Sequence, residues 1–244
     1  MLGKSQAKYI QSLGQKKVRD EAGLFLAEGP KIVSELLHMG AEEIVQLFAV
    51  KDWILQNEKD FAGIDVVEVD EVELGRISQM TTPNKVLATV RKPTSENDLS
   101  AKAMVSIVLD TIQDPGNLGT IIRIADWFNI SQLICSKDCA DVYNPKVVQS
   151  TMGSIMRVQT LYTDLPAWLE EQKDVYIYAA ALEGQNVATM KPLTEGILVI
   201  GNESKGISPD IMKLVDVKIT IPRKGNAESL NAAVATGIIL SHIL

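Results

Sequence analysis

The 244-residue sequence lacks the features that would set it apart from ordinary globular proteins. It has only two cysteines, Cys135 and Cys139, too few for a disulfide framework, so we expect reduced thiols in a cytoplasmic protein. The longest apolar stretch, residues 232–240, contains a threonine and a glycine and is too short to cross a bilayer. No continuous apolar run follows the first basic residues, which argues against a secretory signal.

Metal ligands and nucleophilic triads are also poorly represented. The two histidines, His38 and His242, lie far apart in the sequence, and the Cys-x-x-x-Cys spacing has no second pair, so we expect no metal site. The sequence has no Gly-x-Ser-x-Gly motif, which disfavours a serine hydrolase.

The chain is acidic as a whole but basic at its start. With 31 acidic and 24 basic residues, its net charge is −7, which excludes a uniformly basic nucleic-acid coat. Residues 1–19 nevertheless contain no acid and five bases, which are Lys4, Lys8, Lys16, Lys17 and Arg19. A local basic patch is therefore compatible with the overall charge.

Alternating helix and strand patterns predict an α/β protein with two domains. In the first part we expect helices at 5–13, 30–38 and 70–78, a short helix capped by Asp52, and strands at 24–27, 44–50, 64–69 and 86–90. A polar segment with Pro93 follows. We therefore predict a domain at 1–92, a linker at 93–102 and a second domain at 103–244.

The second part repeats the rhythm with short, almost entirely apolar strands. Strands are expected at 105–109, 133–135, 158–161, 175–180, 197–200 and 217–221. Helices are expected at 117–128, 145–150, 165–171, 210–215 and 229–244. Strands of this kind are typical of a parallel sheet covered on both faces.

Three loops in this part carry polar residues at strand ends, where open α/β sheets bind ligands. The first follows the strand at 105–109 and leads through Asn117 to Arg123, whose guanidinium suits phosphate. The second spans Gly201–Gly206 but lacks the Lys-Ser/Thr of a P-loop, which disfavours a nucleotide triphosphatase. The third leads from Ile221 into the last helix, with Ser229 as a candidate cap. Taken singly, each loop also has an ordinary explanation as a turn or a helix cap.

Together and in this order, the loops resemble the SpoU (TrmH-like) family of RNA ribose methyltransferases, part of the SPOUT class. The residues that carry the resemblance are Asn117-Leu118-Gly119-Thr120-Ile121-Ile122-Arg123, Leu198-Val199-Ile200-Gly201-Asn202-Glu203 with Gly206, and Ile221-Pro222 with Ser229-Leu230-Asn231. More loosely, Arg19 with residues 23–29 is similar to the RNA-binding amino-terminal module of the family.

The resemblance implies a parallel-sheet catalytic domain with a carboxyl-terminal trefoil knot, preceded by a small α/β RNA-binding domain. It implies transfer of a methyl group from S-adenosylmethionine to a ribose 2′-hydroxyl in ribosomal or transfer RNA. Two alternatives remain: a catalytically silent RNA-binding protein of this fold, and a SPOUT enzyme that methylates a tRNA base.

The resemblance also assigns roles to individual residues. The catalytic group would comprise Arg123, Asn117, Glu203, Ser229 and Asn231. The cofactor would be held at Leu182, Gly201, Asn202, Gly206, Ile221 and Leu230. Separately, the basic start of the chain predicts that Lys16, Lys17 and Arg19 bind RNA. Since a guanidinium rarely loses a proton, we expect Arg123 to grip the neighbouring phosphate and stabilise the developing alkoxide.

The last helix predicts a homodimer. Residues 230–244 carry no Asp, Glu, Lys or Arg and are apolar on all sides. A helix of this kind is normally buried on all sides, and a partner subunit would complete its burial. Burial by other helices of the same chain is the alternative, and the family resemblance favours the dimer.

Overall fold

The computed structural model describes residues 2–61, 63–93 and 99–244, which divide into two compact units. Unit 1 comprises residues 1–94 and 141–156, and unit 2 comprises residues 95–140 and 157–244. The sequence predicted one domain over all of 103–244, whereas residues 141–156 are grouped with unit 1.

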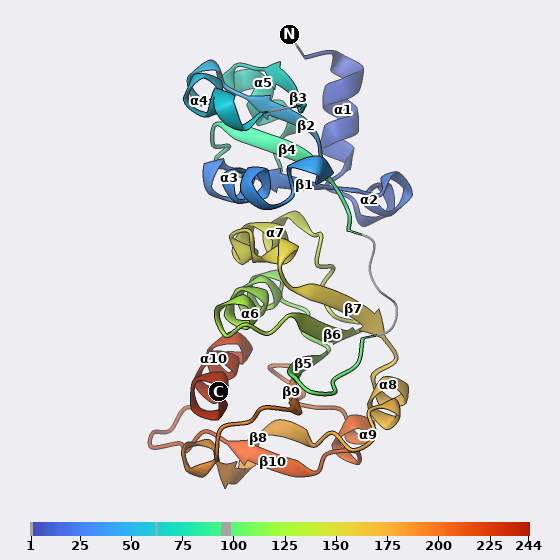
Figure 1. Ribbon diagram of the computed structural model, residues 1–244, viewed down its shortest axis with the longest axis vertical. Helices are drawn as coiled ribbons and strands as arrows, with labels where there is room; N and C mark the ends of the chain where they lie inside the picture. The colour runs from blue at the N-terminus through green and yellow to red at the C-terminus, as the bar shows by residue number, and fades with distance from the viewer. Residues whose placement is uncertain (1, 62, 94–98) are drawn as a thin grey trace. The chain divides into compact units, whose positions relative to one another are not determined.

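Unit 1 is built on a four-stranded mixed sheet with the order β1-β4-β2-β3 (Figure 1). Its strands are β1 (Leu24–Glu28), β2 (Ile44–Ala49), β3 (Asp65–Glu68) and β4 (Val86–Arg91). Its helices are α1 (Lys4–Ser12), α2 (Lys16–Ala22), α3 (Pro30–Met39), α4 (Lys51–Asn57), α5 (Glu71–Ile77) and α7 (Pro145–Thr151). Single 3-10 turns lie at η1 (Ala41–Glu43), η2 (Glu58–Asp60) and η3 (Ser154–Met156).

The helices of unit 1 begin where local chemistry favours it. Asp70 forms a capping box with Glu73 at the start of α5, each side chain accepting the other residue's backbone N–H. At α3, Pro30 occupies the first turn. The expected cap at Asp52 is wrong: α4 has Val50 at its N-cap, and Asp52 lies in the first turn, where its charge favours the helix dipole.

One buried cluster of unit 1 lies between the sheet and the helices α1 and α5, and the buried apolar side chains of α3 also pack on the sheet. Apolar residues spaced three apart, at the end of α1 and on α5, pack against inward-facing strand residues. The buried cluster consists of Ile10, Leu13, Leu26, Phe48, Val69, Leu74, Ile77 and Leu87.

Unit 2 is built on a six-stranded parallel sheet with the order β10-β8-β9-β5-β6-β7. Its strands are β5 (Val105–Asp110), β6 (Gln132–Ser136), β7 (Gln159–Thr163), β8 (Ile177–Asn186), β9 (Gly196–Gly201) and β10 (Val217–Thr220). Its helices are α6 (Pro115–Trp127), α8 (Leu165–Glu171), α9 (Pro209–Met212) and α10 (Ala232–Ile243), with a 3-10 turn at η4 (Val187–Thr189).

Helices cover both faces of this sheet, as the apolar strands predict (Figure 1). On one face, α8 and α9 bury Trp168, Leu169 and Ile211 against Val108 and Val199. On the other face, α6 and α10 lie side by side. The carboxyl ends of the parallel strands meet at one edge, so the polar loops after β5, β9 and β10 gather there.

Several boundaries in unit 2 differ from the sequence prediction: α6 begins at Pro115 and not at 117, α9 ends at Met212 and not at 215, and two further differences concern β8 and α10. Strand β8 continues to Asn186, because Gln185 and Asn186 pair with Ile219 and Thr220 of β10. Helix α10 begins at Ala232, three residues later than expected. None of the helices that the structure describes is long and apolar enough to cross a membrane.

Candidate active site

A chain of side-chain hydrogen bonds joins the three polar loops of unit 2. Asn231, before α10, donates from Nδ2 to Oδ1 of Asn117 at 2.8 Å. Asn117, in the first turn of α6, donates from its own Nδ2 to the carboxylate of Glu203, in the loop after β9. These residues are 114 and 86 positions apart in the sequence. The structure therefore brings Asn117, Glu203 and Asn231 together as one cluster.

The orientation of both amides follows from helix capping. Oδ1 of Asn231 accepts the backbone N–H groups of Ala233 at 3.0 Å and Val234 at 3.2 Å. With its oxygen engaged at the start of α10, Asn231 has only its NH2 group left to face Asn117. Asn117 must present its oxygen to that donor, so its NH2 group faces Glu203.

Ser229 does not take the capping role that the sequence predicted. Asn231 is the N-cap of α10, and Ser229 lies in the exposed segment before it. Ser229 has no hydrogen-bond partner among the described residues, so no hydrogen bond joins it to the cluster. Serine and asparagine are both good N-caps. Only Asn231, however, donates a hydrogen bond to Asn117.

Arg123 lies on α6 but apart from the cluster. It follows Asn117 by six residues, which places it about 9 Å further along the helix axis. Its side chain is exposed and makes no hydrogen bond or ion pair with the part of the chain that the structure describes. Its charge is thus available to a ligand.

The loop after β9 is held by Asn202. Its Oδ1 accepts the backbone N–H groups of Ser204 at 2.9 Å and Lys205 at 3.0 Å, and its backbone pairs with Gly206. A Cβ on Gly201 would lie 2.4 Å from the carbonyl carbon of Gly206, and Gly206 has a φ of +71°. The absence of a side chain on Gly201 therefore allows the backbone at Gly206, in the same loop, to lie against it.

Apolar side chains remain uncovered beside these loops. Leu182, on β8, is 77% exposed, and its carbonyl oxygen accepts the hydroxyl of Thr220 at 3.0 Å. Leu230 is 47% exposed, and Ile221 is half-buried. The sequence placed all three at the cofactor.

The basic residues expected to bind RNA divide into two groups. Lys16 and Lys17 are exposed, and each faces an acid one turn later, Asp20 at 2.7 Å and Glu21 at 3.9 Å. Arg19 is only 2% exposed. Its guanidinium donates to the carbonyl oxygens of Leu13 and Gly14 and pairs with Asp141 at 2.5 Å.

In this structure Arg19 is buried and its guanidinium is bonded within unit 1, so its contacts indicate a structural role and give no support to the expected contact with RNA. Lys16 and Lys17 remain predictions.

The two cysteines are buried free thiols in contact with each other. The hydrogen bond from Cys135 lowers the pKa of Cys139 to about 7, and the same contact raises the pKa of Cys135 well above its usual value. The sulfur of Cys139 also accepts the backbone N–H of Ile112 at 3.2 Å, behind the loop that follows β5.

Two residues at the end of β5 were missed by the sequence analysis. Asp110 is buried and accepts the backbone N–H of Ser208 at 2.7 Å, and the carbonyl oxygen of Thr111 accepts the amide of Asn202 at 2.8 Å. The available signal for Asp110 was a carboxylate at the end of a strand whose only other polar residue is Ser106. Nothing in the sequence marks Thr111, whose φ of +60° is rare for a threonine.

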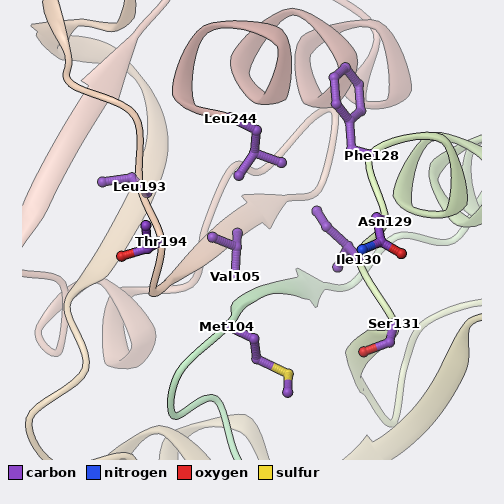
Figure 2. Close-up of a pocket in the computed structure, with 9 residues that line it drawn as sticks. All are labelled: Met104, Val105, Phe128, Asn129, Ile130, Ser131, Leu193, Thr194 and Leu244. Carbon is purple, nitrogen blue, oxygen red and sulfur yellow. The ribbon is translucent and has the colours of Figure 1, made fainter.

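A small cavity of unit 2 lies at the other end of the strands (Figure 2). Met104 and Val105 border it at the start of β5, and Leu193 and Thr194 border it before β9. The described residues contain no cluster of three or more His, Cys, Asp or Glu suited to a metal. The polar cluster at the carboxyl ends is thus the stronger candidate for chemistry.

Comparison with known proteins agrees with this geometry. Residues 104–241, more than half of the chain, match the SpoU rRNA Methylase family. The chain belongs to this family. Residues 4–88 match the MRM3-like substrate binding domain. Family membership confirms the resemblance inferred from the three loops.

Individual relatives extend over nearly the whole chain. The 23S rRNA (guanosine(2553)-2′-O)-methyltransferase RlmP of Bacillus subtilis is 31% identical over 96% of this chain and 93% of its own length. A putative RNA methyltransferase of the TrmH family from Porphyromonas gingivalis has a TM-score of 0.86 and 34% identity, covering 99% of this chain and 98% of its own. An AdoMet-bound rRNA methyltransferase from Sinorhizobium meliloti has a TM-score of 0.87 and 30% identity, covering 100% of this chain and 96% of its own.

Proposed function

We propose that this protein methylates a ribose 2′-hydroxyl in ribosomal or transfer RNA, with S-adenosylmethionine as the methyl donor. The observation that carries the proposal is the hydrogen-bond chain Asn231–Asn117–Glu203, because it unites the three loops by which the family is recognised. The B. subtilis relative, named as a 2′-O-methyltransferase of 23S rRNA, supports the reaction and the class of substrate.

The residues beside the three loops fit the donor. S-adenosylmethionine supplies a methyl group activated on a sulfonium. The exposed side chains of Leu182 and Leu230 offer an apolar surface of the kind that binds an adenine. Backbone groups at Gly201 and Ile221 provide donors and acceptors, and Asn202 and Gly206 fix the shape of the loop. The S. meliloti neighbour was solved with AdoMet bound.

Arg123 acts on the RNA side. Its exposed guanidinium has no partner among the described residues, so it is free to bind the phosphate next to the acceptor ribose and to stabilise the alkoxide as it forms. The hydroxyl proton leaves to that phosphate or to water, because an arginine stays protonated near neutral pH. Asn117, Glu203, Ser229 and Asn231 orient the ribose and the loops.

The product distinguishes this reaction from the alternatives. Incubation of the protein with tritiated S-adenosylmethionine and bulk RNA should label dinucleotides that resist alkali, since 2′-O-methylation blocks cleavage of the next phosphodiester. Label in alkali-sensitive nucleotides would indicate base methylation. Calorimetric binding of S-adenosylhomocysteine with no label in ribosomal or transfer RNA would contradict the proposed activity.

Three further features belong to the proposal. The carboxyl-terminal part of unit 2 forms the trefoil knot of the SPOUT class, and the protein works on RNA in the cytoplasm, as its bacterial ribosomal-RNA relative suggests. The protein is a homodimer, supported by apolar side chains uncovered on α6 and α10: Trp127 is 85% exposed and Val234 is 50% exposed. Sedimentation equilibrium should give twice the chain mass of 26.7 kDa at micromolar concentration, and a constant monomer mass would exclude the dimer.

A further inference from the structure

A buried carboxylate ends β5, next to the proposed donor loop. Asp110 is 5% exposed and is the strand partner of Gly201, at the end of β9. Its Oδ2 accepts the backbone N–H of Ser208 at 2.7 Å, and its Oδ1 accepts the hydroxyl of Thr111 at 3.0 Å. The described residues give Asp110 no ion-pair partner. Burial of a carboxylate costs free energy unless hydrogen bonds compensate for the lost water. The bonds from Ser208 and Thr111 supply this compensation, one to each carboxylate oxygen.

Thr111 has an unusual backbone conformation that serves the same loop. Its φ of +60° is in the left-handed region, which β-branched residues rarely adopt. This conformation directs its backbone N–H to the hydroxyl oxygen of Ser136 at 2.9 Å and its carbonyl oxygen to Nδ2 of Asn202 at 2.8 Å. Thr111 therefore joins the carboxyl end of β6 to the loop after β9.

The segments that carry Asn117 and Glu203 both connect to Asp110 and Thr111. On one side, Thr111 orients the amide of Asn202, whose oxygen holds the turn that contains Glu203. On the other side, Asp114 follows three residues later and accepts the backbone N–H of Asn117 as the N-cap of α6. A shift of Thr111 would move the loop and the helix relative to each other.

We propose that Asp110 and Thr111 are positioning residues for methyl transfer: they set the donor loop at Gly201–Gly206 in register with the first turn of α6. The inference rests on the proposed function. Neither residue touches the acceptor ribose in this assignment; each acts through Asn202, Ser208 and the start of α6. Their loss should therefore lower kcat and donor affinity and leave the KM for RNA unchanged.

Three variants isolate this role. Asp110→Ala removes both acceptors. Asp110→Asn can preserve both bonds, because its oxygen can accept from Ser208 while its NH2 group donates to the hydroxyl of Thr111, which also accepts. Asp216→Ala is the control for the loss of an aspartate bond to a backbone N–H elsewhere in the sheet: its carboxylate, which is exposed whereas that of Asp110 is buried, accepts from Ile177 at 2.8 Å at the amino end of β8. Thr111→Val, which loses only the hydroxyl bond, replaces Asp110→Ala if that variant does not fold.

We expect Asp110→Ala to lower kcat and the affinity for S-adenosylhomocysteine about tenfold each, consistent with the loss of charged hydrogen bonds. Asp110→Asn should keep most of the wild-type kcat and most of the affinity for S-adenosylhomocysteine. Asp216→Ala should match the wild type in both. Hydrogen exchange of residues 202–206 should quicken in Asp110→Ala alone. Wild-type kcat and affinity in Asp110→Ala, equal losses in Asp216→Ala, or no rescue by Asp110→Asn would each overturn the inference.

The exchange measurement separates this inference from the proposed function. If the wild type transfers no methyl group, the proposed function fails. Faster exchange at residues 202–206 in Asp110→Ala, without a change in Asp216→Ala, would still support the positioning role, and unchanged exchange would refute it.

Discussion

The side-chain amide of Asn231 donates to the side-chain oxygen of Asn117 at 2.8 Å, across 114 residues of sequence. The same Asn231 caps α10 through its oxygen, so the position of the last helix and the orientation of Asn117 are determined together. Glu203 completes the chain on the far side of Asn117. The cluster is thus assembled by tertiary contacts between loops that are individually ordinary.

Asn231→Asp should separate the two roles of this residue. Aspartate is as good an N-cap as asparagine, and its charge favours a helix amino terminus, so the free energy of unfolding should stay equal or rise. It cannot donate to Asn117, however, and its carboxylate would face an oxygen acceptor. We expect kcat to fall about tenfold or more, measured by methyl transfer under saturating RNA.

The matched control for this change is Asn144→Asp. Asn144 caps α7 by accepting the backbone N–H of Lys146 at 2.9 Å. The control should keep both stability and kcat. An Asn231→Asp variant with wild-type kcat would show that the bond to Asn117 is dispensable.

Arg123→Ala should abolish methyl transfer without loss of donor binding. Removal of a charged donor at a developing anion typically costs about a hundredfold or more in rate. Arg123→Lys should recover part of the rate, because it keeps the charge and loses the planar fork. Arg76→Ala, on the exposed last turn of α5, is the control. A loss of S-adenosylhomocysteine affinity in Arg123→Ala would indicate that Arg123 contacts the methyl donor and not the RNA.

Most elements could be predicted because their signals are local. The apolar strands of unit 2 and the helix that follows Asp70 depend on residues close in sequence. The cap at Asp114 was missed, because the helix was expected to begin at Asn117, whereas α6 begins at Pro115 with Asp114 as its N-cap. Helix α2 was missed: its sequence, KKVRDEA, has no apolar stripe, and it is secured by Arg19, which pairs with Asp141 122 residues away. The extension of β8 similarly depends on pairing with β10.

Only part of the predicted catalytic group forms the cluster: of the five residues assigned to catalysis, Arg123 and Ser229 lie outside the hydrogen-bond chain. The motifs identified Asn117, Glu203 and Asn231, and the structure joins them. The choice of Asn231 over Ser229 as the cap depends on a partner on another helix, which no local pattern reveals. The left-handed backbone of Thr111 and the burial of Arg19 are likewise consequences of tertiary packing.

Arg19 and the lysines beside it should give opposite results in paired experiments. Arg19→Ala leaves Asp141 without its partner, and breaking a buried pair in this way costs about 3–5 kcal/mol of unfolding free energy. Lys16→Ala with Lys17→Ala should cost little stability, since exposed pairs contribute about 0–1 kcal/mol each. Urea unfolding measures both effects.

RNA binding completes that comparison. The double lysine variant should bind structured RNA more weakly and with a smaller dependence on salt, because fewer counterions are released. Folded Arg19→Ala, assayed at low temperature, should bind RNA as the wild type does. Weaker RNA binding by folded Arg19→Ala than by the lysine variant would restore Arg19 as a phosphate contact.

Glu28→Gln should remove a pH dependence of stability from unit 1. Glu28, at the end of β1, is 5% exposed, and its carboxylate accepts the hydroxyl of Ser78 and the backbone N–H of Gln79. Burial raises the pKa of this carboxyl above its usual 4.5, and the two hydrogen bonds offset part of the increase. The folded state therefore holds the proton more tightly than the unfolded state does. The resulting stability is fully present below pH 4.5 and is lost as the pH rises through the folded-state pKa.

Glutamine has no proton to lose and can keep both bonds, with its oxygen accepting from Gln79 and its NH2 group donating to Ser78. The wild-type unfolding free energy, measured relative to that of Glu28→Gln, should thus decrease as the pH rises above 4.5 and then level off. At pH 7 the variant should be at least as stable as the wild type. Glu28→Ala, which loses both hydrogen bonds, should have a lower unfolding free energy than Glu28→Gln at every pH. A difference between wild type and Glu28→Gln that does not change from pH 4 to pH 8 in urea unfolding would show that burial of Glu28 does not shift its titration.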